Sequence, residues 1–152
     1  MRVVFDTNVW IDWLYFNDIA VDPLKLLRKD KYLEILIDEQ CLAELVIVLK
    51  YKHFYGSEAN ESHIIETVKS LCEFVDTPSL PKPSFWCKDP DDVKFLNLAG
   101  HYRADHLITK DFDLLKRKNR RALKGEKITF SIVTPANFRE LADSGTSETI
   151  GQ

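Results

Sequence analysis

The stretch RVVFDTNVW, residues 2–10, determines how the rest of the chain is interpreted. A continuous apolar run follows the first arginine, and such a run is typical of a short strand that is buried on both faces. Asp6 ends this strand, and residues 8–17 continue with apolar side chains at helical spacing. A carboxylate at the end of a buried strand either caps the following helix or belongs to a functional site.

Short apolar strands alternate with helices along the chain. Beyond the first strand, strands are predicted over residues 32–37, 105–109 and 128–134. Helices are predicted over residues 22–31, 38–54, 57–74 and 89–104, and from Pro135 onward. Asp22 and Asp89 are the expected caps of two of these helices, since a proline follows each of them in the first turn.

Two stretches do not follow this alternation. Residues 77–84 hold three prolines and predict an extended loop. Residues 110–127 are strongly basic and predict a polar loop with a helical turn. The alternation as a whole predicts an α/β fold whose mainly parallel sheet carries helices on both faces.

The composition is that of one soluble globular domain. The 152 residues are 45% hydrophobic and 30% charged, and the net charge of -3 argues against a general polyanion binder. We expect one domain over residues 1–142 and a disordered tail over residues 143–152. Cys41, Cys72 and Cys87 lack the spacing of a zinc site and are expected to be buried and reduced. No signal peptide or membrane-spanning stretch is recognisable, so the expected location is the cytoplasm.

Four acidic residues stand at positions where a site could form. Asp6 and Asp111 follow strands, Asp92 lies in the first turn of the helix after the proline-rich loop, and Glu44 lies in the apolar middle of a long helix. Each alone has a structural explanation, as a helix cap, a dipole partner, a turn residue or a carboxylate on an exposed helix edge. Together they would form one pocket of carboxylates.

Such a pocket has a clear chemical consequence. Four carboxylates repel one another unless a cation joins them. A site with only oxygen ligands selects Mg²⁺ or Mn²⁺ over zinc or copper. A metal ion held there would activate water and neutralise a scissile phosphate.

Several stretches in a fixed order resemble the PIN domain, specifically the stand-alone prokaryotic PIN-domain toxins of the VapC-like type. These stretches are VVFDTNVW, LAELVIVLKYKHF, CKDPDDVKFLNLAGHYRADHLITKDFDLL and IVTPANF. The resemblance extends from Arg2 to about Leu141. It implies a three-layer α/β/α sandwich with a central mainly parallel sheet, and a metal-dependent endoribonuclease that leaves a 5′-phosphate and a 3′-hydroxyl.

The resemblance also implies roles for individual residues. It makes four acids both catalytic and metal-binding: Asp6, Glu44, Asp92 and Asp111. Thr7 and Asn8 would shape the first acidic loop, with Asn8 orienting a ligating carboxylate, and Thr109 belongs to the pattern that ends in the fourth acid. The cofactor would be Mg²⁺ or Mn²⁺.

The third and fourth acids each have an alternative. Relatives often carry a further aspartate where this chain has Val93, which leaves the third acid open between Asp91 and Asp92. Helical phase favours Asp92, because apolar residues three, four and seven positions later share its face, and Asp91 would then be the outer, capping acid. Asp113 is the alternative to Asp111.

An acidic pocket needs basic residues to hold an acidic polymer. Six side chains are candidates for contacts with RNA phosphates: Lys50, Lys116, Arg117, Lys118, Arg120 and Arg121. Lys52 and Lys124 extend this set, and four aromatic residues would favour single-stranded RNA by stacking on unpaired bases, namely Phe54, Tyr55, Trp86 and Phe112. The other interpretation is a solvated basic loop with packed aromatic residues.

Partners are implied mainly by the resemblance. A toxin of this family needs an inhibitory antitoxin protein, usually encoded beside it, and relatives commonly form homodimers. Aromatic residues cluster after the first strand, at Trp10, Trp13, Tyr15 and Phe16. They belong either to the core or to a subunit interface.

Other functions fit parts of the sequence. Phosphoryl-transfer enzymes with an aspartyl nucleophile want a second aspartate where this chain has Asn8, and Lys110 and Lys127 do not fit a phospho-acceptor receiver domain. A PIN-like fold also serves an RNA- or protein-binding module with a weak or dead site. An active nuclease could, in addition, process RNA without being a toxin.

Overall fold

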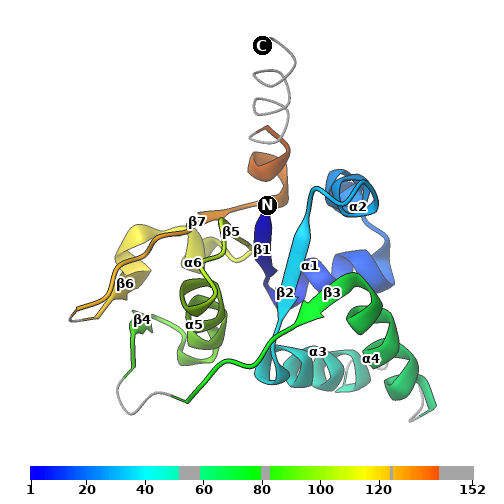
Figure 1. Cartoon of the computed structure of the whole chain (residues 1–152), viewed down its shortest axis with the longest axis horizontal. Helices are drawn as coiled ribbons and strands as arrows, with labels where there is room; N and C mark the ends of the chain where they lie inside the picture. Colours follow the sequence, from blue (N-terminus) through cyan, green and yellow to red (C-terminus); the bar gives the residue numbers. More distant parts are fainter. Residues whose placement is uncertain (52–58, 80–82, 124, 141–152) are drawn as a thin grey trace.

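The computed structural model describes residues 1–51, 59–79, 83–123 and 125–140. A five-stranded sheet with the strand order β3-β2-β1-β5-β7 forms its centre (Figure 1). Its strands are β1 (Arg2–Phe5), β2 (Glu34–Ile37), β3 (Cys72–Phe74), β5 (His106–Ile108) and β7 (Ser131–Val133). All four strand pairings are parallel, so the carboxyl ends of the strands share one edge of the sheet.

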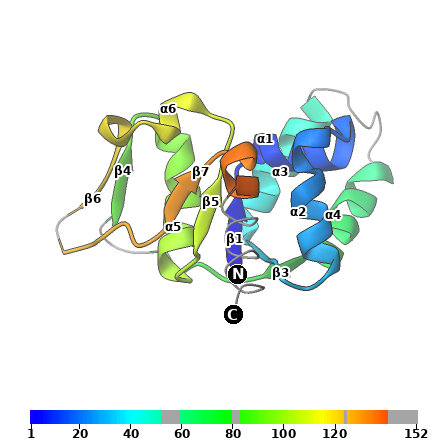
Figure 2. The same ribbon diagram turned by 90° about the horizontal axis from the view of Figure 1, so that it is seen from above.

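Helices flank this sheet, which confirms the predicted three-layer α/β/α architecture (Figure 2). The α-helices are α1 (Thr7–Ile11), α2 (Asp22–Lys29), α3 (Glu39–Tyr51), α4 (Ala59–Leu71), α5 (Val93–His101) and α6 (Phe112–Leu115). A π-helical turn covers Asp12–Phe16, and 3-10 turns cover Ile19–Val21, Pro90–Asp92 and Arg117–Asn119. A further helix begins at Pro135, as the sequence predicts.

The central strand β1 explains why the core forms where it does. Val3, Val4 and Phe5 are each at most 1% exposed, because β1 has a strand on both sides and helices over both faces. The helix α5 packs against β1 and β5, and α3 packs against α1, α4 and α5. Burial of these apolar side chains is the main favourable term in folding.

The aromatic cluster after β1 divides between core and surface. The Trp10 ring is 2% exposed and lies edge-on to Phe5, with 5.1 Å between the ring centroids. Trp13 packs against the same pair from a partly buried position. Tyr15 and Phe16 are exposed at the end of the π-helical turn. The core interpretation therefore holds for the two tryptophans.

Strand β3 corrects the predicted helix over residues 57–74. Cys72–Phe74 leave the helix and extend the sheet at its edge, with Ile35 opposite Cys72 and Ile37 opposite Phe74. The free edge of β2 offers these residues backbone hydrogen bonds, and that tertiary contact outweighs their helical periodicity. The predicted cap Asp22 is also displaced by one position, since Val21 is the N-cap and Asp22 lies within α2.

A two-stranded antiparallel ribbon forms where the sequence predicts no strand. It pairs β4 (Phe85–Cys87) with β6 (Arg120–Ala122). Phe85 and Cys87 are buried and Trp86 between them is 38% exposed, so the alternation of a strand is present but only three residues long. The Phe85 ring lies against Gly100 of α5, where a Cβ atom would come within 2.6 Å of it. The ribbon is thus attached to α5 by close packing.

Two smaller expectations concern the cysteines and membranes. Cys41 and Cys87 are buried and Cys72 is partly buried, and all three are free thiols. Burial raises the pKa of the Cys87 thiol to about 11. No helix in the described part of the chain is long and apolar enough to cross a membrane.

Candidate active site

Asp6 lies at the carboxyl end of the central strand and begins α1. It is 5% exposed, and its carboxylate accepts hydrogen bonds from the backbone N–H of Asn8 at 3.3 Å and from the Thr109 hydroxyl at 2.6 Å. Burial raises the pKa of Asp6, these two hydrogen bonds oppose the shift, and the nearby carboxylates of Asp111 and Glu44 add to it. Asp6 is therefore both a helix cap and a carboxylate among others.

Thr109 connects the first acid to the fourth. Strand β5 lies next to β1 with Phe5 opposite Ile108, so Asp6 and Thr109 leave the sheet side by side. The buried Thr109 hydroxyl donates to Asp6 and accepts a hydrogen bond from the backbone N–H of Asp111 at 3.0 Å. Asp111 in turn caps α6 by accepting from the backbone N–H of Asp113 at 2.9 Å.

Asp92 ends the 3-10 turn that leads into α5 and faces the acids at the strand ends. Burial raises the pKa of Asp92 to about 7, and repulsion from Asp6, Asp89 and Asp111 contributes to the shift. Phe95 and Ala99 of α5 are buried, as helical phase predicts for a helix whose first acid faces the site.

The neighbouring acids of this turn have different surroundings. Asp91 is exposed. The prediction that Asp91 is the capping acid is wrong. The cap is Asp89, whose carboxylate accepts from the backbone N–H of Asp91 at 3.0 Å. Asp89, Asp92, Asp111 and Asp113 share a pocket of about 270 Å³ whose lining includes Asn119.

Glu44 of α3 meets a basic residue that the sequence analysis did not single out. One oxygen of its carboxylate accepts from the Thr7 hydroxyl, and the other lies 2.8 Å from the Lys94 ammonium nitrogen. The Lys94 ammonium also donates to the backbone carbonyl of Asp91. Lys94 lies 50 positions from Glu44 in the chain, and its only local signal is its place two residues after Asp92.

The donor set is suited to a hard divalent cation. Asp6, Asp92 and Asp111 offer carboxylate oxygens and Thr109 a hydroxyl, which are ligand types that Mg²⁺ and Mn²⁺ accept. The repulsion that raises the pKa of Asp92 is what a bound cation would remove. In the parts of the chain that the structure describes, no three acidic, histidine or cysteine side chains already lie close enough to hold an ion.

The predicted basic residues fall into two groups. Lys116, Arg117 and Lys118 are exposed between α6 and β6, and Arg121 lies on β6 with its guanidinium 4.9 Å from the Trp86 ring. Arg120 is partly buried, and burial lowers its pKa, with a smaller contribution from nearby Arg117. These residues follow the element that Asp111 caps.

The other predicted contacts lie elsewhere. Lys50 forms an ion pair with Glu61 of α4 at 3.0 Å. Phe112 is exposed at the start of α6, close in sequence to Asp111. Lys52, Phe54, Tyr55 and Lys124 lie outside the described residues, as does the predicted tail over residues 143–152.

This chain belongs to the PIN domain family, whose sequence model matches residues 2–113, a range that includes all four predicted acids. PIN domains are generally nucleases and typically use divalent metal ions. The chain is also 30% identical over 150 residues to the uncharacterised protein MJ1680 of Methanocaldococcus jannaschii, an alignment that covers 92% of this chain and 90% of that protein.

A solved structure has the same fold. It is the crystal structure of VapBC2 from Rickettsia felis bound to a DNA fragment from their promoter. The match has a TM-score of 0.60 and 16% sequence identity, and it covers 88% of this chain and 98% of the other. At this identity the likeness concerns the fold.

Proposed function

We propose that this protein is a metal-dependent endoribonuclease that hydrolyses phosphodiester bonds of RNA. The observation that carries the proposal is the convergence of Asp6, Asp92 and Asp111 from three separate elements. Burial raises the pKa of Asp92 to about 7, and repulsion from Asp6 and Asp111 adds to that shift. Membership of the PIN domain family supports it independently, since PIN domains are generally nucleases.

Each acid has a proposed role. Asp6 and Asp92 would hold Mg²⁺ or Mn²⁺, and Glu44 and Asp111 would complete the site or orient the attacking water. When bound, the ion supplies an activated water and charge neutralisation at the scissile phosphate. Asp113 is the substitute for Asp111.

Neighbouring polar groups would hold these acids in place. The hydroxyl of Thr109 orients Asp6, the hydroxyl of Thr7 orients Glu44, and the backbone N–H of Asn8 fixes the second oxygen of Asp6. Because each of these hydrogen bonds restricts a carboxylate, the free protein is partly organised for its ligand.

The proposed substrate is single-stranded RNA. Lys116, Arg117, Lys118, Arg120 and Arg121 would contact backbone phosphates beside the acids, and Lys50 would do so from α3 if it releases Glu61. Trp86 and Phe112 are exposed near these residues and present ring surface on which unpaired bases can stack.

We further propose that the protein is the toxin of a toxin–antitoxin pair, inhibited in the cytoplasm by an antitoxin protein. The similar solved structure is a VapBC toxin–antitoxin complex with DNA, which supports a partner of that kind. A homodimer is proposed as well, and Tyr15 and Phe16 are the exposed aromatic residues that would contribute to its interface.

Cleavage of a labelled single-stranded RNA pool tests the enzymatic proposal. The purified protein is assayed with Mn²⁺, with Mg²⁺ and with EDTA, beside Asp92→Asn and Asp91→Asn. Metal-dependent cutting that is lost in Asp92→Asn and kept in Asp91→Asn is the expected result. Loss of cleavage in Asp91→Asn alone would identify Asp91 as the third metal ligand and would still support a nuclease.

An RNA-binding module whose acidic site does not cut is the second candidate. It is favoured by the Lys94 ammonium, which lies 2.8 Å from the Glu44 carboxylate and neutralises it. Mn²⁺ titration decides between the two functions. A module with a dead site would bind RNA without binding Mn²⁺ at the acids.

A further inference from the structure

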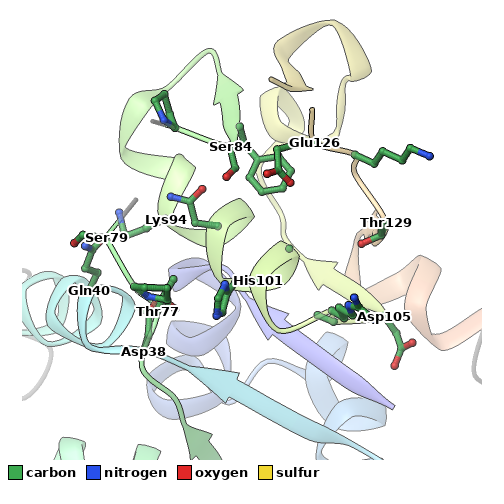
Figure 3. Close-up of a pocket in the computed structure, with 18 residues that line it drawn as sticks. Asp38, Gln40, Thr77, Ser79, Ser84, Lys94, His101, Asp105, Glu126 and Thr129 are labelled. Carbon is green, nitrogen blue, oxygen red and sulfur yellow. The ribbon is translucent and has the colours of Figure 1, made fainter. Parts of the chain in front are cut away.

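A second and larger pocket lies along α5, and Lys94 is part of its lining. We call it the α5 pocket. It measures about 900 Å³, within the usual range of ligand sites. Its lining includes residues of α5, residues 77–79 and 83–84 of the proline-rich loop, and Glu126, Lys127 and Thr129. Figure 3 shows Asp38, Gln40, Thr77, Ser79 and Lys94 gathered toward one end of the pocket, with His101 nearer its middle.

Lys94 joins this pocket to the acidic site. Its side chain lines the pocket, while its ammonium nitrogen lies 2.8 Å from the Glu44 carboxylate and donates to the backbone carbonyl of Asp91. An ammonium group has three N–H donors, so one remains after these two hydrogen bonds. Lys94 can therefore contact a phosphate of an RNA strand that extends from the acidic site into the pocket.

The lining of the α5 pocket does not favour a highly charged ligand. Its charged side chains balance, since three acids oppose three basic residues: Asp38, Asp105 and Glu126 against Lys94, Arg103 and Lys127. Neutral polar side chains make up much of the remainder, including Gln40, Ser79 and Ser84. A neutral ligand with several hydrogen-bonding groups suits such a lining better than a phosphate does.

Two of the lining residues have polar atoms that nothing in the described chain satisfies. The hydroxyl oxygen of Thr77 and the side-chain carbonyl oxygen of Asn97 are buried and have no hydrogen-bond partner among the described residues. Buried polar atoms are rarely left unpaired. Because neither oxygen has a partner among the described residues, neither of these two atoms gives up a hydrogen bond there when it contacts a ligand.

We propose that the α5 pocket binds an unpaired nucleobase of the RNA substrate, one that adjoins the scissile phosphate. Asn97 and Thr77 contact the hydrogen-bonding edge of the base, and Lys94 contacts the phosphate that connects the base to the cleavage site. A carboxamide presents a donor and an acceptor side by side, which is the pattern by which asparagine and glutamine recognise base edges. This inference rests on the proposed ribonuclease function and names how that function selects its substrate.

Two variants remove the unpartnered groups while keeping the size of the side chain similar, Thr77→Val and Asn97→Leu. Both are assayed for cleavage of an RNA pool with randomised positions around the cut, in the presence of Mn²⁺. We expect kcat/KM for the preferred sequence to fall about tenfold, the loss typical of one hydrogen bond, and the base preference at one position beside the cut to flatten. Thermal stability should not fall, because each change removes a buried polar atom that has no partner.

Thr67→Val on α4 is the matched control, since it makes the same change outside the pocket, and it should keep both the rate and the preference. If Asn97→Leu does not fold, Thr77→Val tests the proposal alone. Unchanged kcat/KM and unchanged base preference in the pocket variants would overturn the proposal, while the measured cleavage would still support the ribonuclease function. If the wild-type protein does not cut RNA with any metal, the proposed function itself fails.

Discussion

Lys94 contacts Glu44 of the acidic site and also lines the α5 pocket. The two regions differ in the kind of ligand that their side chains favour. The acidic site has excess negative charge, and burial together with this charge raises the pKa of Asp92 to about 7. The α5 pocket has balanced charges and holds the unpartnered polar atoms of Thr77 and Asn97. The first region gains most from a cation, and the second from a neutral ligand with hydrogen-bonding groups. A strand of RNA with a metal ion would satisfy both.

The largest expected effect is loss of cleavage in Asp6→Asn. The change removes one negative charge from the proposed metal site and almost no volume, and the amide can still accept the Thr109 hydrogen bond. We expect RNA cleavage to fall at least about a hundredfold, more than the typical loss of a group that only orients a ligand. Circular dichroism should show an intact fold. Wild-type cleavage rates in this variant would show that the site assignment is wrong.

The next effect concerns the residue that the two regions share. Lys94→Met keeps the length of the side chain and removes the charge that contacts Glu44 at 2.8 Å. We expect kcat/KM on single-stranded RNA to fall about tenfold, because a charge-assisted contact to phosphate is lost. Lys69→Met on α4 is the control and should retain the wild-type value. Equal kcat/KM values for Lys94→Met and Lys69→Met would show that Lys94 does not contact the RNA substrate.

A smaller effect concerns stability in the absence of metal: we expect Asp92→Asn to have a higher free energy of unfolding than the wild type. The pKa of Asp92 is about 7 in the folded protein and 3.8 as its ordinary value. Protonated Asp92 thus favours the folded state, and this stability, complete below about pH 4, is lost as the pH rises through 7. Since Asp92 is partly exposed, we expect Asp92→Asn to exceed the wild type by only about 1 kcal/mol at pH 8.

Thermal unfolding in EDTA at pH 4 and pH 8 measures this difference, with Asp91→Asn as the control on the exposed neighbour. The gain of Asp92→Asn should disappear near pH 4, where the wild-type carboxyl is neutral. Added Mn²⁺ should stabilise the wild type more than Asp92→Asn. Equal thermal stability of the wild type and Asp92→Asn at pH 8 would contradict the raised pKa of Asp92.

The smallest effect distinguishes charged contacts from neutral ones. Arg117 and Lys118 are exposed in the turn before β6, and the double variant Arg117→Ala/Lys118→Ala removes two proposed phosphate contacts. The slope of log affinity against log salt concentration should become shallower by about 1.4, roughly 0.7 for each contact to a single strand. Asn97→Leu should weaken binding without changing that slope. A slope that is the same in the double variant and the wild type would remove this turn from the RNA-binding surface.

Much of the acidic site could be predicted because its signals are local. Asp6 follows a strand that is apolar at every position, and the face that Asp92 shares with Phe95 and Ala99 follows from helical spacing. The interpretation of Trp10 as core follows from its size and apolar neighbours. Glu44 stands out in the sequence because its neighbours are apolar, whereas no local pattern indicates that Lys94 is its partner.

The alternation of strands and helices and the parallel sheet can be predicted from the sequence, because they depend on periodicity over a few residues. Three features require the tertiary structure: Cys72–Phe74 extend the sheet, β4 pairs with β6, and Lys94 contacts Glu44. These contacts join residues that are far apart in the chain, from 33 positions between Cys87 and Arg120 to 50 positions between Glu44 and Lys94. Short segments have weak local preferences, so the partner available in space decides their structure.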